Sequence, residues 1–171
     1  EYIVVGSNDN DVSLFGKDSS TPLWNYTIGD TVNSVAISAD GEYIAVGSND
    51  ANVYLFDKDS ATPIWSYTTG HYVYSVAISA DGEYIAAGSN KVYLFDKESS
   101  TPLWSYLTLD YVHLVAISAG GEYIVASSSS LDMITQEVNL FNKGSSTPLW
   151  SYAARPESVA ISTDGEYIVM G

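Results

Sequence analysis

The chain has 171 residues, enough for one domain with a sizeable hydrophobic core, and 21 acidic against 6 basic residues give it a formal net charge of −15. An acidic surface of this size repels phosphate backbones and anionic membranes, which disfavours nucleic acids and membrane surfaces as partners. The absence of cysteine excludes disulfides and thiolate metal sites, and the apolar runs are too short to cross a bilayer.

Two short motifs recur along the chain at a nearly constant period. The glycine of Gly-Glu-Tyr falls at residues 41, 82, 121 and 165, with spacings of 41, 39 and 44. Pro-Leu/Ile-Trp ends at residues 24, 65, 104 and 150, with spacings of 41, 39 and 46. Periods of roughly 40–45 residues with strand-like content are typical of β-propellers rather than helical solenoids.

Taken in chain order, the sequence opens at the second strand of a unit (2–7), passes through three complete units and ends with a first and a second strand (158–162 and 167–170). The clearest complete unit shows four strand signals, at residues 76–79, 84–87, 92–95 and 103–106. Asp-Gly between the first two strands predicts a tight hairpin turn of the primed type, because glycine adopts the positive φ that such a turn needs. Pro102 is expected to start the last strand, where no ladder N–H is required.

These elements predict an all-β fold, a single β-propeller domain over residues 1–171, with blades of four antiparallel strands and about four repeats of 39–46 residues. The approximate units are 1–30, 31–71, 72–110, 111–155 and an incomplete 156–171. The tally of 17 strands exceeds the 16 of a four-bladed ring, which favours an arc of a larger ring of about seven or eight blades. A small ring of four blades, or two chains pairing into one ring, is the alternative.

Two stretches carry a family resemblance. The run "SVAISADGEYIAVGSNDANVYLFD" resembles a WD-repeat blade, and "VYLFDKDSATPIWSYTTG" resembles a quinoprotein-type blade, in which a tryptophan docks on the neighbouring blade. The mixture is similar to surface-layer and extracellular propeller proteins of archaea. A Gly-His pair precedes the first strand of one unit alone, at Gly70-His71, so the recognition functions of WD-repeat proteins are not implied.

The quinoprotein resemblance implies an oxidoreductase that uses pyrroloquinoline quinone. The chain lacks the cysteines of the vicinal disulfide in alcohol-oxidising members, and it has no long catalytic insertion. The two histidines, His71 and His113, do not occupy equivalent positions in the repeat, and neither lies in a nucleophile motif. We therefore expect no enzyme activity and no cofactor.

The connections of the repeat differ in how much they vary. The first-to-second turn and the third-to-fourth loop barely change, whereas the fourth-to-first and second-to-third connections differ in every unit. In a propeller these two variable connections emerge on one face, where binding residues tend to lie, although unconstrained drift in loops would give the same pattern. The candidate interaction residues are Asp9, Asp11, Asp30, Asp50, His71, Tyr72, Asp110, Tyr111, Met133 and Arg155.

Weaker signals accompany this face. The turns "SNDND" and "SNDAN" gather oxygen ligands suited to calcium, but they match no EF-hand loop, and hairpin turns favour the same residues. Asn25 begins a single glycosylation pattern, Asn-Tyr-Thr.

The sequence therefore predicts a non-catalytic binding or structural scaffold at the cell surface or in the cell envelope. Its partner would be a protein, a glycan or a neighbouring subunit. The alternatives are a quinoprotein-like oxidoreductase, or a subunit of a surface layer or filament that self-associates through blade edges.

Overall fold

The computed structural model describes residues 1–108, 110–129 and 136–171. The regular secondary structure of these residues consists of β-strands alone. The first sheet contains β1 (Tyr2–Gly6), β2 (Asp11–Gly16) and β3 (Pro22–Thr27). The second contains β4 (Val32–Ile37), β5 (Tyr43–Ser48), β6 (Asn52–Asp57) and β7 (Trp65–Thr68). The third contains β8 (Ser75–Ile78), β9 (Tyr84–Gly88), β10 (Lys91–Asp96) and β11 (Trp104–Leu107). The fourth contains β12 (Tyr111–Ile117), β13 (Tyr123–Ser129), β14 (Gln136–Asn142) and β15 (Trp150–Tyr152), and the fifth β16 (Val159–Ile161) and β17 (Ile168–Met170).

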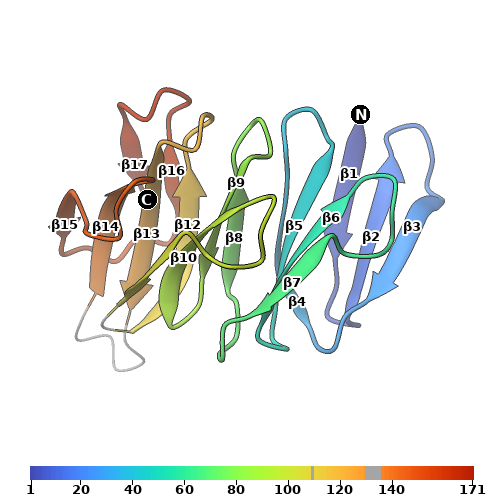
Figure 1. Cartoon of the computed structure of the whole chain (residues 1–171), viewed down its shortest axis with the longest axis horizontal. Helices are drawn as coiled ribbons and strands as arrows, with labels where there is room; N and C mark the ends of the chain where they lie inside the picture. Colours follow the sequence, from blue (N-terminus) through green and yellow to red (C-terminus); the bar gives the residue numbers. More distant parts are fainter. Residues whose placement is uncertain (109, 130–135) are drawn as a thin grey trace.

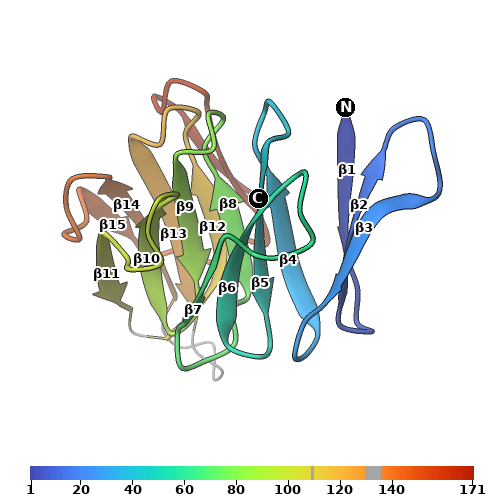
Figure 2. The same ribbon diagram turned by 45° about the vertical axis from the view of Figure 1, so that its right-hand side comes forward.

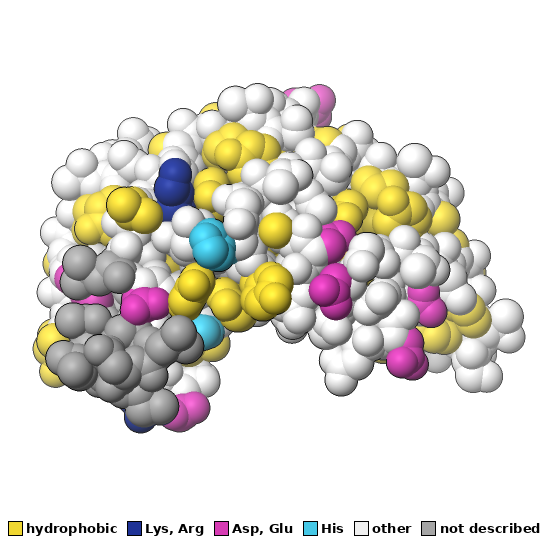
Figure 3. All heavy atoms as spheres, turned by 90° about the horizontal axis from the view of Figure 1, so that it is seen from below, with side chains coloured by type: hydrophobic (Ala, Val, Ile, Leu, Met, Phe, Trp, Pro, Cys, Tyr) yellow, Lys and Arg dark blue, Asp and Glu magenta, His cyan; other side chains and the backbone are white. Residues whose placement is uncertain are grey.

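Each sheet is antiparallel, and its strands lie in the order in which they occur in the chain. The prediction of an all-β chain with four-stranded blades is confirmed. The sheets stand side by side (Figures 1 and 2) and follow one another along an arc, whose hollow side is visible in Figure 3. The first strands pack against each other in succession, β4 on β8, β8 on β12 and β12 on β16. A larger closed ring stays a prediction.

The hairpin at each Asp-Gly is longer than the predicted tight turn. Ser38 N donates to Tyr43 O at 3.0 Å and Gly41 N donates to Ser38 O at 2.9 Å, so the loop between the bonded Ser38 and Tyr43 has four residues, 39–42. The positive φ of Gly41, 77°, is as expected, but it follows an ordinary turn instead of forming part of a primed one. The fourth strand also differs, because β11 begins at Trp104 rather than Pro102.

The hydrophobic core lies between the sheets, one cluster to each junction. Between the second and third sheets, Leu55 and Val53 pack against Phe95, Ile85 and Val76, all of them 0–6 % exposed. The middle strands are buried on both faces, since four consecutive residues of β6 and of β10 are buried. Each sheet is therefore stable only against its neighbours, as the blade pattern predicts.

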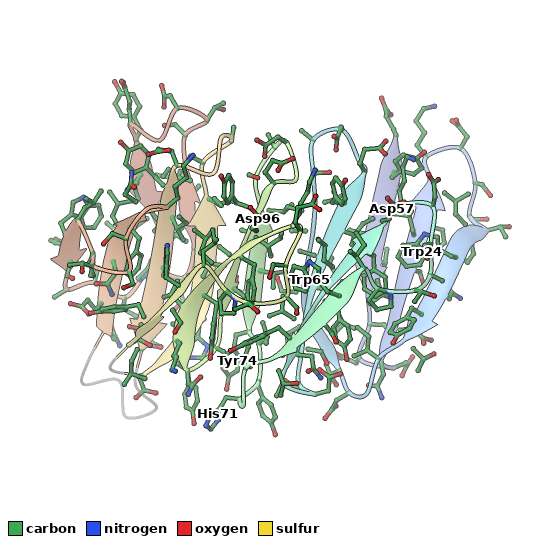
Figure 4. The ribbon with its side chains drawn as sticks, viewed as in Figure 1. Trp24, Asp57, Trp65, His71, Tyr74 and Asp96 are labelled. Carbon is green, nitrogen blue, oxygen red and sulfur yellow. The ribbon has the colours of Figure 1, made fainter. Side chains whose placement is uncertain are left out.

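Repeated side chains join each sheet to the next. The indole N–H groups of Trp24, Trp65 and Trp104 each donate to a lysine carbonyl of the following sheet at 2.8 Å. Their rings pack on a phenylalanine of that sheet, with centroids 5.3 Å apart for Trp65 and Phe95. Figure 4 shows Trp24 and Trp65 beside Asp57 and Asp96, the residues that precede the acceptor lysines. The expectation that these tryptophans dock on the adjacent blade is confirmed.

The Gly-Glu-Tyr turn makes a second repeated contact. A Cβ on Gly82 would lie 2.5 Å from Cδ2 of Tyr43, because the tyrosine ring of one sheet covers the glycine of the next. Just after the first strands of successive sheets, Ala39 N donates to Ala80 O at 3.0 Å and Ala80 N donates to Ala119 O at 2.8 Å. Glycine in this motif therefore serves both the turn conformation and the junction between sheets.

Candidate interaction face at the variable end

The two kinds of connection leave the sheets at opposite ends. We call the lower end in Figure 1 the variable end; it carries the β3–β4, β7–β8, β11–β12 and β15–β16 connections and the β1–β2, β5–β6 and β9–β10 hairpins. The upper, invariant end carries the repeated turns and the lysine-containing loops. Figure 3 views the molecule from the variable end, and both histidines are visible there.

Five aromatic side chains meet at this end and form what we call the aromatic cluster: His71, Tyr72, Tyr74, Tyr111 and His113. Tyr74 is central, since its ring centroid lies 4.8 Å from that of His113, 5.7 Å from that of Tyr111 and 6.3 Å from that of Tyr72. His71 lies 5.8 Å from Tyr111, edge to face. His71 and Tyr74 lie at the lower edge of Figure 4. Such tilted and edge-on ring pairs are mutually favourable.

A β-bulge places Tyr74 and His113 in the cluster. In β12 the pairing with β13 shifts by one residue between Val112 and Leu114, leaving His113 unpaired in the ladder. In the third sheet Tyr74 N donates to Gly88 O while Ser75 also faces Gly88, so two residues again oppose one. Bulges re-aim side chains in this way. The bulge therefore recurs at the same position of the second, third and fourth sheets.

The surroundings of Tyr74 and His113 favour the uncharged form of each ring. Desolvation, followed by the neighbouring Tyr111, Tyr72 and Asp110, raises the pKa of Tyr74. Desolvation lowers the pKa of His113, and the carboxylate of Asp110 opposes that effect. The hydroxyls of Tyr72, Tyr74 and Tyr111 make no hydrogen bond within the described residues, whereas the buried Tyr54 donates to Asp50.

Most of the predicted acidic candidates serve the local turns. Asp50 accepts from the Tyr54 hydroxyl at 2.5 Å, from Gly29 N at 3.2 Å and from Asn52 N at 2.9 Å. Asp11 accepts from the Thr27 hydroxyl at 2.7 Å, and Asp30 and Asp110 each accept from the backbone N–H of the next residue. The carboxylate of Asp9 makes no hydrogen bond within the described residues.

Arg155 lines a cavity of about 210 Å³ between the fourth and fifth sheets. The remaining lining residues are His113, Leu114, Ser127, Ser129, Pro156 and Glu157. His113 therefore belongs both to the aromatic cluster and to the cavity wall. Met133 lies outside the described residues.

Of the predicted residues, the structure thus brings together His71, Tyr72 and Tyr111, with Asp110 next to Tyr111 in the chain. Arg155 lines the same cavity as His113. It adds Tyr74 and His113, which the sequence prediction did not include. A signal for both exists in the repeats. The residue before Ser/Leu-Val-Ala-Ile-Ser is Asn33, Tyr74, His113 and Glu157 in successive units, so it changes every time between constant neighbours.

The described residues offer little for the calcium or quinone chemistry that the sequence raised as weaker alternatives. They contain no group of three or more His, Asp or Glu side chains placed to hold a metal ion. Pyrroloquinoline quinone is a polycarboxylate, and the cations near the variable end in the described part are Lys91 and Arg155, among several carboxylates. This donor set does not fit the quinone. The described residues also include no helix suited to crossing a membrane, and Asn25 is exposed on β3.

A family model described as outer membrane protein assembly factor BamB matches residues 8–138, about three quarters of the chain. The match supports the quinoprotein-like character of the repeats, while the WD-repeat and archaeal surface-layer resemblances stay predictions. A search of curated proteins finds no match to this chain. Together with the four-stranded blades, the match to most of the repeats shows that the chain belongs to the family of outer membrane protein assembly factor BamB.

Proposed function

We propose that this chain is a non-catalytic binding scaffold whose variable end docks a protein partner in the cell envelope. The observation that carries the proposal is the aromatic cluster, in which five rings from the β7–β8 connection and β12 gather at the variable end. Tyrosine supplies a large apolar face and a polar tip at low entropic cost, and it is enriched in the energetically important centres of protein interfaces. The sheets behind it supply a rigid frame.

Two further observations support a protein partner. Tyr72 is 52 % exposed, and the cluster hydroxyls make no hydrogen bonds within the described residues, so they are available to a partner. The family description names a protein assembly factor of the outer membrane, and this supports both a protein partner and an envelope location. The histidine rings contact tyrosine rings, which favours packing and recognition over general acid–base catalysis.

Site-specific photo-crosslinking in the cells that make the protein tests this proposal. A benzophenone amino acid replaces Tyr72 at the variable end or, as the matched control, the exposed Thr101 at the invariant end. The proposal predicts a discrete protein adduct from position 72 and none from position 101. Equal crosslinking from both positions, or an adduct to glycan alone, would overturn it.

A further inference from the structure

The first three junctions between sheets share one arrangement at the variable end. A valine of each following sheet, Val32, Val73 or Val112, packs on a glycine of the preceding one and donates its N–H to a serine carbonyl there. A Cβ on Gly47 or Gly88 would lie 2.6 or 2.7 Å from Cγ1 of the facing valine. The backbone bonds, to Ser7, Ser48 and Ser89, measure 3.1, 3.0 and 2.7 Å. Valine therefore fills the space between sheets at each of these junctions.

A serine hydroxyl adds a second bond between inner strands. Ser34 Oγ accepts from Val76 N at 3.1 Å, and Ser75 Oγ accepts from Val115 N at 3.1 Å. Because both arrangements recur, they define what an ordinary junction of this fold requires.

The fourth junction departs from the pattern at all three positions. Pro156 stands where the other junctions have valine, and proline has no N–H to donate. Ser127 replaces the glycine, and Leu114 replaces the serine whose hydroxyl would accept from the next sheet. These three residues line the cavity of about 210 Å³. The cavity thus occupies the place that valine and its hydrogen bonds fill elsewhere.

The same junction keeps two of the repeated contacts at the invariant end. Ala119 N donates to Thr163 O at 3.1 Å, as the equivalent residues do at the earlier junctions, and the ring of Tyr123 covers Gly165. The three departures described above lie at the variable end, next to the aromatic cluster.

The lining supplies complementary charges. Arg155 is the sole arginine of the chain, and its guanidinium makes no ion pair or hydrogen bond within the described residues. By contrast, Lys58, Lys97 and Lys143 at the invariant end all pair with glutamates. A planar guanidinium binds a carboxylate through two parallel hydrogen bonds, and the nearby Glu157 carboxylate can accept an N–H.

We propose that this cavity binds the C-terminal residue of a polypeptide, with its carboxylate on Arg155 and its last backbone N–H directed to Glu157. The proposal rests on the proposed function, because it names part of what the variable end recognises. The volume agrees with one residue, since pockets for larger organic ligands span roughly 300–1,000 Å³. Chain termini offer a carboxylate and an N–H donor close together, which matches this pair of side chains.

The single arginine provides the test, because its Nε–Hε group gives one signal in a ¹H–¹⁵N NMR spectrum. The labelled protein is titrated with acetyl-glycyl-phenylalanine that carries a free C-terminal carboxylate, with its C-terminal amide, and with acetyl-aspartyl-phenylalanine amide. The proposal predicts a saturable shift of the arginine signal with the free carboxylate alone. No shift with any peptide, or an equal shift with either amide, would overturn it; a shift with the aspartyl peptide alone would assign the cavity to acidic side chains instead.

Two variants complete the experiment. Arg155→Lys keeps the charge but loses the paired hydrogen bonds, and it should weaken peptide binding about tenfold, followed on the remaining backbone signals. The triple variant Leu114→Ser, Ser127→Gly, Pro156→Val restores the ordinary junction and keeps Arg155, so it should fold at least as well and lose binding. Retained binding in the triple variant would contradict the proposal. Crosslinking from position 72 separates the two claims: if it persists while peptides fail to bind, only the cavity assignment is wrong.

Discussion

The two ends of the sheets differ in how closely they follow the repeat, although the same strands run between them. At the invariant end the first three junctions use the same contacts, a tryptophan on a phenylalanine and a tyrosine over a glycine, and a lysine pairs with a glutamate within the second, third and fourth sheets. At the variable end each connection is different, and the differences gather the aromatic cluster and the cavity beside Arg155. Repeated residues therefore pack sheet on sheet, and residues that depart from the repeat form the surface available for recognition.

The largest expected effect concerns the docked tryptophans. Trp65→Ala removes a ring packed on Phe95 and an indole hydrogen bond to Lys97 O, so it should lower the free energy of unfolding by about 3 kcal/mol or more. Trp150→Ala is the control, because that side chain is 39 % exposed, and it should cost about 1 kcal/mol. Urea denaturation followed by circular dichroism measures both. Equal losses would break the distinction between docked and exposed tryptophans.

Two glycines with positive φ, one at each end of the sheets, should differ in their tolerance of alanine. Gly82 has a φ of 74° and is covered by the Tyr43 ring, whereas Gly70, in the β7–β8 connection, has a φ of 90° and open space around it. Gly82→Ala should cost about 2–3 kcal/mol, because it combines left-handed strain with a steric clash, and Gly70→Ala about 1 kcal/mol from strain alone. Thermal unfolding of the two variants gives the difference. A Gly70 variant as damaged as the Gly82 variant would contradict the assigned contact.

The loss of folding stability at low pH should arise in part from carboxylates at the invariant end. The Ser38 hydroxyl at 2.6 Å and Glu42 N at 3.0 Å hold the pKa of Asp40 below its usual 3.8. Because the folded-state pKa is depressed, this carboxylate stabilises the fold above pH 3.8, and its contribution is lost as the pH falls through the lower folded-state pKa.

Asp40→Asn should therefore destabilise the protein at pH 7 but scarcely change it near about pH 2. Asp9→Asn at the variable end, where the carboxylate makes no hydrogen bond within the described residues, is the control and should change little at either pH. Urea midpoints at the two pH values measure the effect. A pH-independent loss in the Asp40 variant would argue against the carboxylate as its source.

The smallest expected effect is a gain. Ala51 in the β5–β6 hairpin has a φ of 69°, in the left-handed region, while the equivalent residue of the first hairpin is Asn10, with a φ of 72°. Ala51→Asn should raise the free energy of unfolding by about 0.5–1 kcal/mol, because asparagine tolerates this conformation better than alanine. A shift of the thermal midpoint reports the gain, and a lower midpoint would show that the turn depends on other contacts.

The blades could be predicted from the sequence because the residues that form them recur in each unit. Trp65, Gly82 and Tyr43 appear in equivalent positions of several units, and their spacing alone predicts strands that pack sheet on sheet. The candidate site was predicted only in part. Tyr74 and His113 were not singled out within the variable connections, because the sequence alone does not show the bulges that turn both side chains to the variable end.

The cavity was missed for a different reason. Leu114, Ser127 and Pro156 lie in separate segments, and each substitution alone looks unremarkable in a repeat that tolerates change. Only the fold brings them to one junction, where together they remove a packed valine and two hydrogen bonds. Comparing units position by position, with the junction contacts known, would have identified them.

The central claim, that the aromatic cluster is a recognition surface rather than core, is tested most directly by the double variant Tyr74→Ser, Tyr111→Ser. Two quantities are measured on it: the photo-crosslinking yield from position 72 and the free energy of unfolding. If the rings form a recognition surface, the adduct is lost while the free energy of unfolding falls by no more than about 1–2 kcal/mol. An adduct that survives, together with a loss of several kcal/mol, would show that these rings are structural and would contradict the account.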